Sequence, residues 1–560
     1  MSPFLKTHRL VLTPLSPIHI GCGEDFEPTQ YVIDDSVLYG FDPSRAALTD
    51  LQKGKLLDAA NKAALLAIQR FFRDNASAFR PHADVLIPVS AGVAQQYEQR
   101  IGRAANLEAS GNSVVNNLAI ERTSHTGARR LPFIPGSSFK GCLRTAMLDA
   151  INQGGVASPE DKDRRGGVDA TRLEKRLFKG DFATSPLRLI KPSDLMPASS
   201  EGPARRVLYA VNLKKRQVIK DGREMQPKGI AARKECILHA QYRAFTGEAV
   251  LQMLNGQENA KETPDPAMRP ADLRQIARQC NAYHLARFEG EMRVLDQRGF
   301  VDPGWKSAVE RLLAGPLKKR LDEGDAFLVR LGRYGGAESK TLSGEGVASI
   351  KIMGGKGQPP TFQSSTKTVW LAAEHEHDQK GLLPFGWAVV EIDPQSDAPE
   401  LQAWCTQQAA GRPDMARLRQ RLEDERRAAE SHKEAMRQQA ATREAAKAAE
   451  IAAAAARAEA LASLSGQARE IEQLRLKCEE LAARITGGNF KKQPPEPGKA
   501  GLYQEANTLV KRALESPDWS AADKHALAEM LEQWMPLVIG PWDAKEQRKK
   551  LKLSALKGHS

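Results

Sequence analysis

The segment IPGSSFKGCLR at residues 134–144 joins a glycine turn to an amphipathic helix and places cations at the junction. Lys140 and Arg144 are four residues apart, so they share one helical face close to the helix N-terminus. Free amides and the helix dipole favour an anion at that end. The segment therefore predicts a phosphate site, the alternative being an ordinary strand-to-helix turn with a solvated basic face. The site residues expected here are Gly136, Ser137, Ser138, Lys140 and Arg144, with either serine able to cap the helix.

A second glycine-containing segment lies near the N-terminus. Residues 8–26 predict a strand, with Leu10 and Leu12 on one face, followed by a turn that contains His19, Gly21 and Gly23. Two glycines separated by one residue allow another backbone to approach closely, and a ligand strand is a candidate for that backbone. His19 beside this turn could transfer protons in RNA cleavage, or simply bond a phosphate or a backbone carbonyl.

The third segment, residues 326–357, is a short strand followed by a glycine-rich cationic loop. Its spacing matches neither a dinucleotide fingerprint nor a P-loop, so nucleotide hydrolysis is poorly supported. Basic side chains with one aromatic suit a single-stranded nucleic acid, because charge follows the backbone and rings stack on bases. The candidate binding residues are Arg330, Gly332, Arg333, Tyr334, Gly335, Gly336, Lys340 and Thr341.

The composition favours anionic partners. The chain has 560 residues, 41% of them hydrophobic, with a formal net charge of +13. Several domains are expected, and no apolar run is long enough to span a bilayer, so we expect a cytoplasmic protein. The six cysteines are scattered, which predicts buried free thiols and no disulfide framework. No cofactor and no bound metal are expected.

Two acidic groups are weaker candidates for chemistry. Glu24 and Asp25 could hold a metal for phosphodiester hydrolysis, although a solvated loop is the simpler interpretation. Residues 374–378, EHEHD, offer alternate ligands but are more typical of an exposed polar turn.

Strands and helices mix along the first 400 residues without a strict parallel repeat, which predicts an α+β fold. We expect residues 92–130 to form a mobile basic loop, and the alternation in 235–245 predicts a strand. The other expected elements are a hairpin at 30–42, helices at 44–75, 137–152 and 271–323, and strands at 85–90, 186–195, 206–213, 327–331 and 386–392.

The chain changes character after about residue 400. Residues 412–485 are dense in Ala, Glu, Arg and Gln, which predicts a long helix. Large apolar residues are too sparse for a sustained heptad seam, so an exposed helix or helical hairpin is preferred to a stable dimeric coiled coil. A linker at 487–501 precedes a small helical module, in which Ser520 caps a helix through Asp523, and a basic tail.

Taken together, four segments resemble the RAMP superfamily of CRISPR proteins. They are SPIHIGCGEDFEPTQYVIDD, IPGSSFKGCLRTAML, LRLIKPSDL and LGRYGGAESKT, and GLLPFGWAVVEI is similar to that family's closing strand. The greatest similarity is to the subunit of type III-A (Csm) effector complexes that caps the 3′ side of the guide RNA. The resemblance covers residues 8 to about 393, whereas the extension after about 400 departs from the family pattern.

The resemblance implies RRM-like, ferredoxin-type domains and a role in guide binding or maturation. By position it assigns three groups to guide-RNA backbone contact: His19, Gly21 and Gly23; Gly136, Ser137, Ser138, Lys140 and Arg144; and Gly332 to Thr341. The implied division is a first RAMP domain at 1–250, a second RAMP-like part at 251–400, a long helix or hairpin at 401–486, a linker at 487–501 and a helical module at 502–560.

Three functions remain open from the sequence. The first is a non-catalytic crRNA-binding subunit of a type III antiviral ribonucleoprotein, seated at the 3′ side of the guide beside other RAMP subunits, with target RNA as a further candidate partner. The second is a RAMP endoribonuclease that trims the crRNA or cleaves target RNA. The third is a scaffold whose C-terminal helical arm recruits a separate nuclease, such as one of the host.

Overall fold

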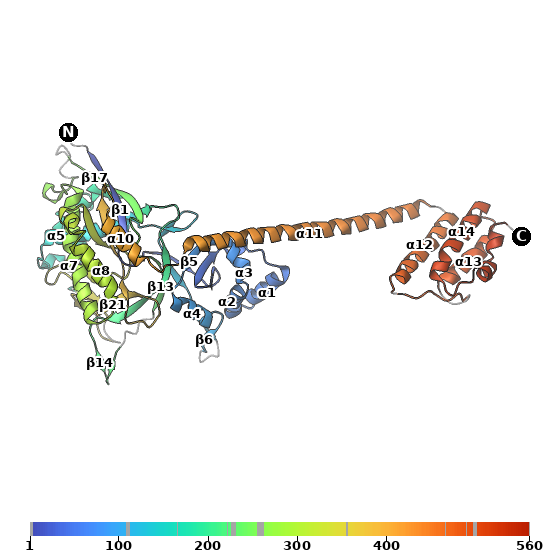
Figure 1. Cartoon of the computed structure of the whole chain (residues 1–560), viewed down its shortest axis with the longest axis horizontal. Helices are drawn as coiled ribbons and strands as arrows, with labels where there is room; N and C mark the ends of the chain where they lie inside the picture. Colours follow the sequence, from blue (N-terminus) through green and yellow to red (C-terminus); the bar gives the residue numbers. More distant parts are fainter. Residues whose placement is uncertain are drawn as a thin grey trace. The chain divides into compact units, whose positions relative to one another are not determined.

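The computed structural model describes residues 4–107, 113–164, 166–220, 222–225, 231–254, 262–353, 357–464, 466–488, 490–496 and 501–558. Backbone contacts divide the chain into two units, residues 1–430 and 431–560 (Figure 1). The finer five-part division expected from the sequence stays a prediction. No helix within these described ranges is both long and apolar enough to cross a membrane.

The first unit contains an antiparallel sheet, sheet A, in which β1 is central. Its strands are ordered β11-β17-β1-β23-β18, and β12 pairs with β17. Leu10 and Leu12 of β1 are fully buried in one core with Phe139 of α5, which confirms the predicted strand face. The bounds are β1 Leu5–Pro14, β11 Ile190–Pro192, β12 Met196–Pro197, β17 Phe245–Gln252, β18 Ala326–Arg330 and β23 Trp387–Ile392.

Helices cover sheet A (Figure 1). The first half of α7 joins the core of Leu10 and Leu12, whereas Phe288 and Met292 in its second half belong to a second core with α8. The helix expected at 137–152 is confirmed as α5, and the helices expected within 271–323 as α7, α8 and α9. The bounds are α5 Gly136–Asn152, α6 Ala170–Leu177, α7 Leu273–Gln297, α8 Pro303–Ala314, α9 Lys318–Glu323 and α10 Pro399–Gln408.

A second sheet, sheet B, has the order β2-β8-β16-β13-β21-β22. The β8–β16 pair is parallel and the other pairs are antiparallel. Val207 and Tyr209 of β13 share a core with Leu328 and Val389 of sheet A, so the two sheets are packed together. The bounds are β2 Gly21–Phe26, β8 Ile120–Thr123, β13 Arg205–Lys214, β16 Ala232–Ile237, β21 Thr368–Ala373 and β22 Leu383–Pro384.

A three-stranded layer lies between β2 and β8 of sheet B along the chain. The predicted hairpin at 30–42 is confirmed as β3–β4, with Asp35 and Ser36 at positive φ in the turn. The elements are β3 Tyr31–Asp34, β4 Val37–Phe41, β5 Ala83–Pro88, α1 Asp50–Asn61, α2 Leu65–Asp74, α3 Ala76–Phe79 and α4 Ala91–Arg100. The remaining small strands are β6 Ala104–Leu107, β7 Ser113–Val115, β9 His125–Thr126, β10 Leu131–Pro132, β14 Ile219–Lys220, β15 Arg223–Glu224, β19 Ile350–Ile352 and β20 Thr361–Gln363. The 3-10 helices are Pro43–Arg45, Arg80–His82, Pro159–Asp161, Pro186–Leu189, Pro266–Met268 and Ala337–Lys340.

The α+β class is confirmed, but three local expectations are wrong. Residues 92–130 are not a mobile loop, because they contain most of α4 and the strands from β6 to β9, although 108–112 lie outside the described residues. The glycine turn at 21–23 is the start of β2 and not a connection between strands. The alternation of 235–245 is broken between β16 and β17, where Ala240 and Arg243 have positive φ and the chain reverses.

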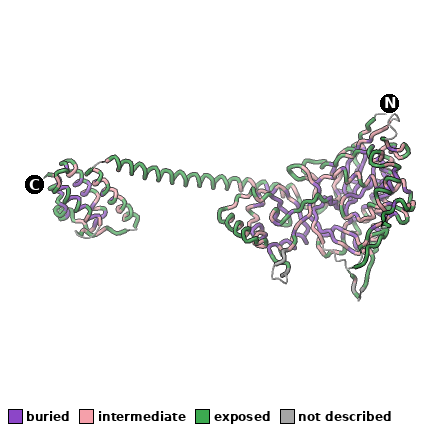
Figure 2. Tube along the Cα trace, turned by 180° about the vertical axis from the view of Figure 1, so that it is seen from behind, coloured by how far each residue is buried: buried purple, intermediate pink, exposed green. Residues whose placement is uncertain are grey.

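The long helix is confirmed as α11, which runs from Met415 to Ser463. Its first turns belong to the first unit, where Leu422 is buried with Phe41 and Phe72. Residues 431–460, in contrast, are exposed throughout (Figure 2).

The second unit has a core of its own, which includes Leu474, Tyr503 and Leu531. Ser520 caps α14 as predicted, because its hydroxyl accepts a hydrogen bond from the Asp523 amide at 3.1 Å. The expected basic tail is instead two short helices whose Leu551 and Leu553 are buried in this core. The bounds are α12 Gly466–Thr486, α13 Leu502–Glu515, α14 Ala521–Val538, α15 Ala544–Lys550 and α16 Leu553–Leu556.

Candidate nucleic-acid interface

Two of the three glycine segments meet directly, and we call residues 19–23 and 330–336 together the glycine junction. Gly332 follows β18 with φ +79°, and its neighbour Arg333 donates its amide to the His19 carbonyl at 2.9 Å. A Cβ atom on Gly332 would lie 2.3 Å from the same carbonyl oxygen. The glycine is therefore required for the approach of one protein segment to another.

The two glycines of β2 serve different purposes. A Cβ on Gly21 would lie 2.6 Å from Oε1 of Glu121, so this position must be small to admit a side chain from β8. Gly23 has φ +82° and open space around it, and the register of β2 shifts between Gly21 and Asp25. The backbone of a ligand was expected to approach Gly21. The space beside Gly21 is instead filled by the Glu121 side chain of the same protein.

The charges of the junction are paired around Glu121. Its Oε1 lies 2.6 Å from Nη1 of Arg333 and 3.4 Å from Nε2 of His19, and its Oε2 is bonded to Lys234. The hydrogen bond from His19, assisted by the Lys234 ammonium, holds the pKa of Glu121 well below its ordinary value although burial opposes this.

His19 is sealed inside the protein. It is 0% exposed, and its Nδ1 lies 2.8 Å from the Glu235 carbonyl oxygen. A general base must reach the proton that it removes. His19 therefore has no access to a bound RNA in this conformation, and its contacts are those of a residue that joins the segment before β2 to β8 and β16.

Arg330 is also directed inward. Its guanidinium donates to Glu291 at 2.7 Å and to the Phe385 carbonyl at 3.1 Å, and it stacks over the Trp387 ring. Tyr334 is packed between rings, with Trp370 and Phe385 at centroid distances of 5.2 Å. The side chains of both residues are thus engaged by the protein itself. Gly335 packs against the Arg330 side chain, and Gly336, at φ +75°, precedes the short helix that contains Lys340.

The start of α5 differs from its expected form. No serine caps the helix; Asp194, which lies 58 residues away, accepts the Gly136 amide at 2.7 Å. A Cβ on Gly136 would lie 2.8 Å from the carbonyl oxygens of Pro192 and Ser193. The start of α5 therefore packs closely against the end of β11 and the residue that follows it. A carboxylate therefore already lies at the helix N-terminus where a phosphate was expected, while Ser137 is exposed and Ser138 partly exposed.

The two cations of α5 have different surroundings. Nε of Arg144 donates to Glu174 at 2.8 Å, so its charge is already paired. Lys140 is half-buried, and burial together with the nearby ammonium of Lys191 lowers its pKa. Among the described residues, no carboxylate lies within ion-pair distance of Lys140 or Lys191. We call these two residues the lysine pair.

The third segment packs against α5. Sγ of Cys142 donates to the Arg330 carbonyl at 2.8 Å, and Nδ2 of Asn152 donates to the Ser343 carbonyl at 2.8 Å. Lys340 is exposed between these contacts, whereas the Thr341 carbonyl accepts a hydrogen bond from Tyr283 at 2.7 Å. The three segments are therefore neighbours in the fold, as expected.

Lys191 was not among the site residues expected from the sequence, although LRLIKPSDL was one of the segments that resemble the RAMP superfamily. A group formed by Cys22, Glu24 and His125 was not expected either, and Asp25 is not a part of it. In the run at 374–378, Glu374 pairs with Arg206 at 2.7 Å and Glu376 with Arg100 at 2.9 Å. The two glutamates of this run are thus occupied by arginines, and Asp378 accepts the His375 amide at 2.8 Å.

The chain is similar to known proteins in part of its length. Residues 11–227 match the sequence model of the RAMP superfamily. A chain in the cryo-EM structure of a Csm-crRNA-target RNA ternary complex of a type III-A CRISPR-Cas system is 16% identical, with a TM-score of 0.43, covering 69% of this chain and 100% of that chain. The crystal structure of T. onnurineus Csm5 is 15% identical, with a TM-score of 0.32, covering 68% of this chain and 99% of that chain. No curated protein matches the sequence.

Proposed function

Because residues 11–227 match the sequence model of the RAMP superfamily, we propose that this chain is a non-catalytic crRNA-binding subunit of a type III CRISPR-Cas antiviral ribonucleoprotein. It binds the 3′ side of the guide, contacts neighbouring RAMP subunits and aids maturation of the crRNA. The exclusion of His19 from solvent supports binding over catalysis.

The observation that carries this proposal is the lysine pair. Lys140 has no carboxylate partner among the described residues, and its burial together with the nearby charge of Lys191 lowers its pKa. An RNA phosphate placed between them would relieve this repulsion and gain two charge-assisted contacts. We therefore assign Lys140 and Lys191 to the guide backbone, with Ser137, Ser138 and Lys340 beside them.

The test is the double variant Lys140→Ala with Lys191→Ala in the full chain, produced together with its guide RNA. We expect less bound guide and a log-affinity against log-salt slope that is shallower by about 0.7, since the two lysines share one phosphate and each phosphate neutralised on single-stranded RNA contributes about 0.7. Filter binding over a salt series measures the slope, and gel analysis of the co-purified RNA measures its yield and length.

Two controls make the result specific. Lys53→Ala with Lys55→Ala removes the same charge from exposed positions of α1 and should leave the slope unchanged. Arg144→Ala removes a cation of α5 that is already bonded to Glu174, and should have a smaller effect than the lysine pair. An unaltered slope in the lysine variant, or cleavage of labelled RNA by the pure protein, would contradict the proposal.

A second candidate role belongs to the C-terminal unit: recruitment of a separate protein such as a host nuclease. The separate core of this unit favours it. Truncation after Glu430 retains the Leu422 contact of α11 and removes the second unit. We expect the truncated chain to keep its guide RNA and to lose one co-purifying protein in mass spectrometry; an identical set of partners would reject recruitment.

A further inference from the structure

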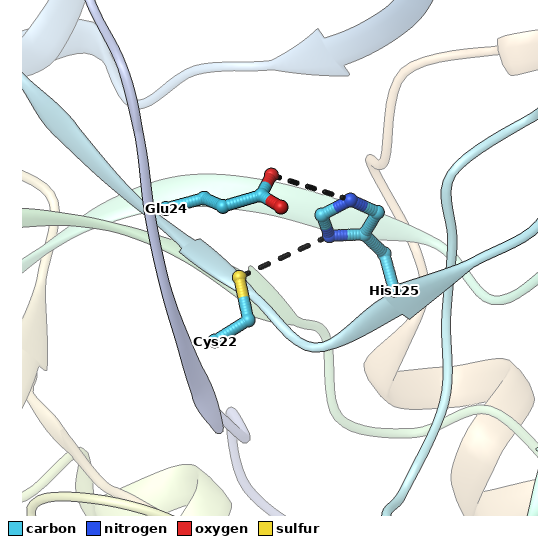
Figure 3. A group of neighbouring side chains, drawn as sticks. All are labelled: Cys22, Glu24 and His125. Carbon is cyan, nitrogen blue, oxygen red and sulfur yellow. Dashed lines mark hydrogen bonds and ion pairs between the residues drawn. The ribbon is translucent and has the colours of Figure 1, made fainter.

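Cys22, Glu24 and His125 gather where β2 lies beside the β9–β10 hairpin (Figure 3). One ligand atom of each residue lies within 4.8 Å of the others. Nε2 of His125 is 3.6 Å from Oε2 of Glu24, and Sγ of Cys22 is 4.0 Å from Nδ1 of His125. An ion takes only one nitrogen of the ring, so the three ligand atoms must close from within 4.8 Å of one another to the about 3.3–3.6 Å of a tetrahedral zinc site.

We propose that these three side chains bind one zinc-class divalent ion. The donor set is a thiolate, an imidazole and a carboxylate, which suits zinc and neighbouring transition metals. Magnesium and calcium prefer oxygen donors only, so the same group discriminates against them. Cys22 and Glu24 are exposed, which leaves room for water as a fourth ligand.

The orientation of His125 supports this assignment. Its Nδ1 lies 3.1 Å from the Thr123 carbonyl oxygen, which accepts a hydrogen bond and therefore fixes the proton on Nδ1. A histidine that ligates a metal through one nitrogen commonly donates its other N–H to a carbonyl in this way. The lone pair of Nε2 is thus free and lies on the side of Glu24.

The local charges suit a bound cation. Nη1 of Arg122 donates to Oε2 of Glu24 at 2.9 Å, and the same oxygen lies 3.6 Å from Nε2 of His125, so the arginine orients the carboxylate toward the ring. Arg122 is balanced in turn by Glu235, 3.9 Å from its Nε. Formation of the metal–sulfur bond releases the Cys22 proton to solvent. One thiolate and one carboxylate then neutralise a divalent ion.

The ion would fasten a weakly held hairpin. Strand β9 contains only His125 and Thr126, and the hairpin carries exposed Arg129 and Arg130 at its tip. A metal bond from His125 to β2 connects positions about a hundred residues apart in the chain, and such long closures stabilise the folded state. The inference does not depend on the proposed RNA role.

The experiment uses the full chain without a histidine tag, stripped with a chelator and titrated with Zn²⁺ alone. We expect one equivalent bound per chain and a higher thermal midpoint. Titration with Co²⁺ should give visible ligand-field bands and a near-ultraviolet thiolate-to-cobalt band. Cys22→Ser should abolish that band, and His125→Gln should weaken binding at least about tenfold.

The matched control is His377→Gln, which removes an exposed histidine from the acidic run at 374–378 and should change nothing. Circular dichroism establishes that each variant is folded before titration. The proposal is overturned if no stoichiometric ion binds the wild-type chain, if folded Cys22→Ser retains the cobalt spectrum, or if His377→Gln alone abolishes binding. Equal affinity for Mg²⁺ would overturn it as well, because the thiolate would then have no part in binding.

Discussion

The glycine junction and the lysine pair are both cationic, yet they differ in what neutralises them. At the junction, Lys234 and Arg333 converge on Glu121, and Arg330 is bonded to Glu291. The ammonium groups of Lys140 and Lys191 lie near one another, without a carboxylate at ion-pair distance in the described part of the chain. A cation that is already paired gains little from a phosphate, whereas an unpaired one gains its full contact. The density of basic residues is therefore a poor guide to where RNA binds.

Among the variants of the glycine junction, Gly332→Ala is expected to lower the free energy of unfolding the most. The added Cβ would meet the His19 carbonyl at 2.3 Å, and alanine disfavours φ +79°. We expect a loss of about 3 kcal/mol in the free energy of unfolding, measured by urea denaturation. Gly23→Ala is the matched control, because φ is similar at +82° but no atom lies within 4 Å, so about 1 kcal/mol is expected. Equal losses would show that contact at Gly332 is unimportant.

Glu121→Gln removes the carboxylate on which the junction cations converge. It should cost about 2 kcal/mol at neutral pH, since His19, Lys234 and Arg333 lose their common acceptor. Guide affinity should not fall, because two cations are released from internal pairing. A marked loss of RNA binding would instead place Glu121 or its partners in the interface.

The same variant has a defined pH dependence. The pKa of Glu121 is lower in the folded chain than its ordinary value of 4.5, so its stabilisation is complete above that pH and is lost as the pH falls further. The difference in stability between wild type and Glu121→Gln should therefore shrink under acid conditions. Urea denaturation at neutral pH and at a pH below 4.5 would reveal this; a constant difference would argue against the depressed pKa.

The smallest effect on stability is expected at the lysine pair. Lys140→Ala with Lys191→Ala removes no described ion pair and relieves a repulsion, so unfolding should change by no more than about 0.5 kcal/mol. A variant that binds less RNA at an unchanged free energy of unfolding would separate the role of the lysine pair from that of the glycine junction. A large loss of stability would mean that the lysines act within the fold.

Local sequence patterns predicted the elements well where the decisive contacts are local. The apolar repeat of α5 and the turn at Asp35 and Ser36 belong to this class. The cap of α5 could not be found in the same way, because Asp194 comes from the distant connection between β11 and β12. The strand at Gly21 was mistaken for a turn. The residue that requires a glycine at this position is Glu121, which lies a hundred residues further along the chain.

The candidate site shows the same division. The glycine and cation motifs indicated the three segments that come together, but not which cations have partners. Whether a cation is paired depends on acidic residues that are distant in the sequence. Only the tertiary structure brings Glu174 to Arg144 and Glu121 to Arg333. Cys22 and Glu24, two residues apart on one strand, did carry a local signal for a shared face. His125, the third residue of this group, is distant in the sequence and gave no local signal that it belongs with them.

The exposed part of α11 has a consequence for how the chain responds to heat. A helix of 49 residues extends about 73 Å, and residues 431–460 bury no side chain against a core. Its order depends on alanine content and neighbouring backbone bonds, so helicity should fade gradually with temperature. The two folded parts on either side of this stretch can remain folded while it frays. A protease that cuts within the stretch would release each of these parts intact.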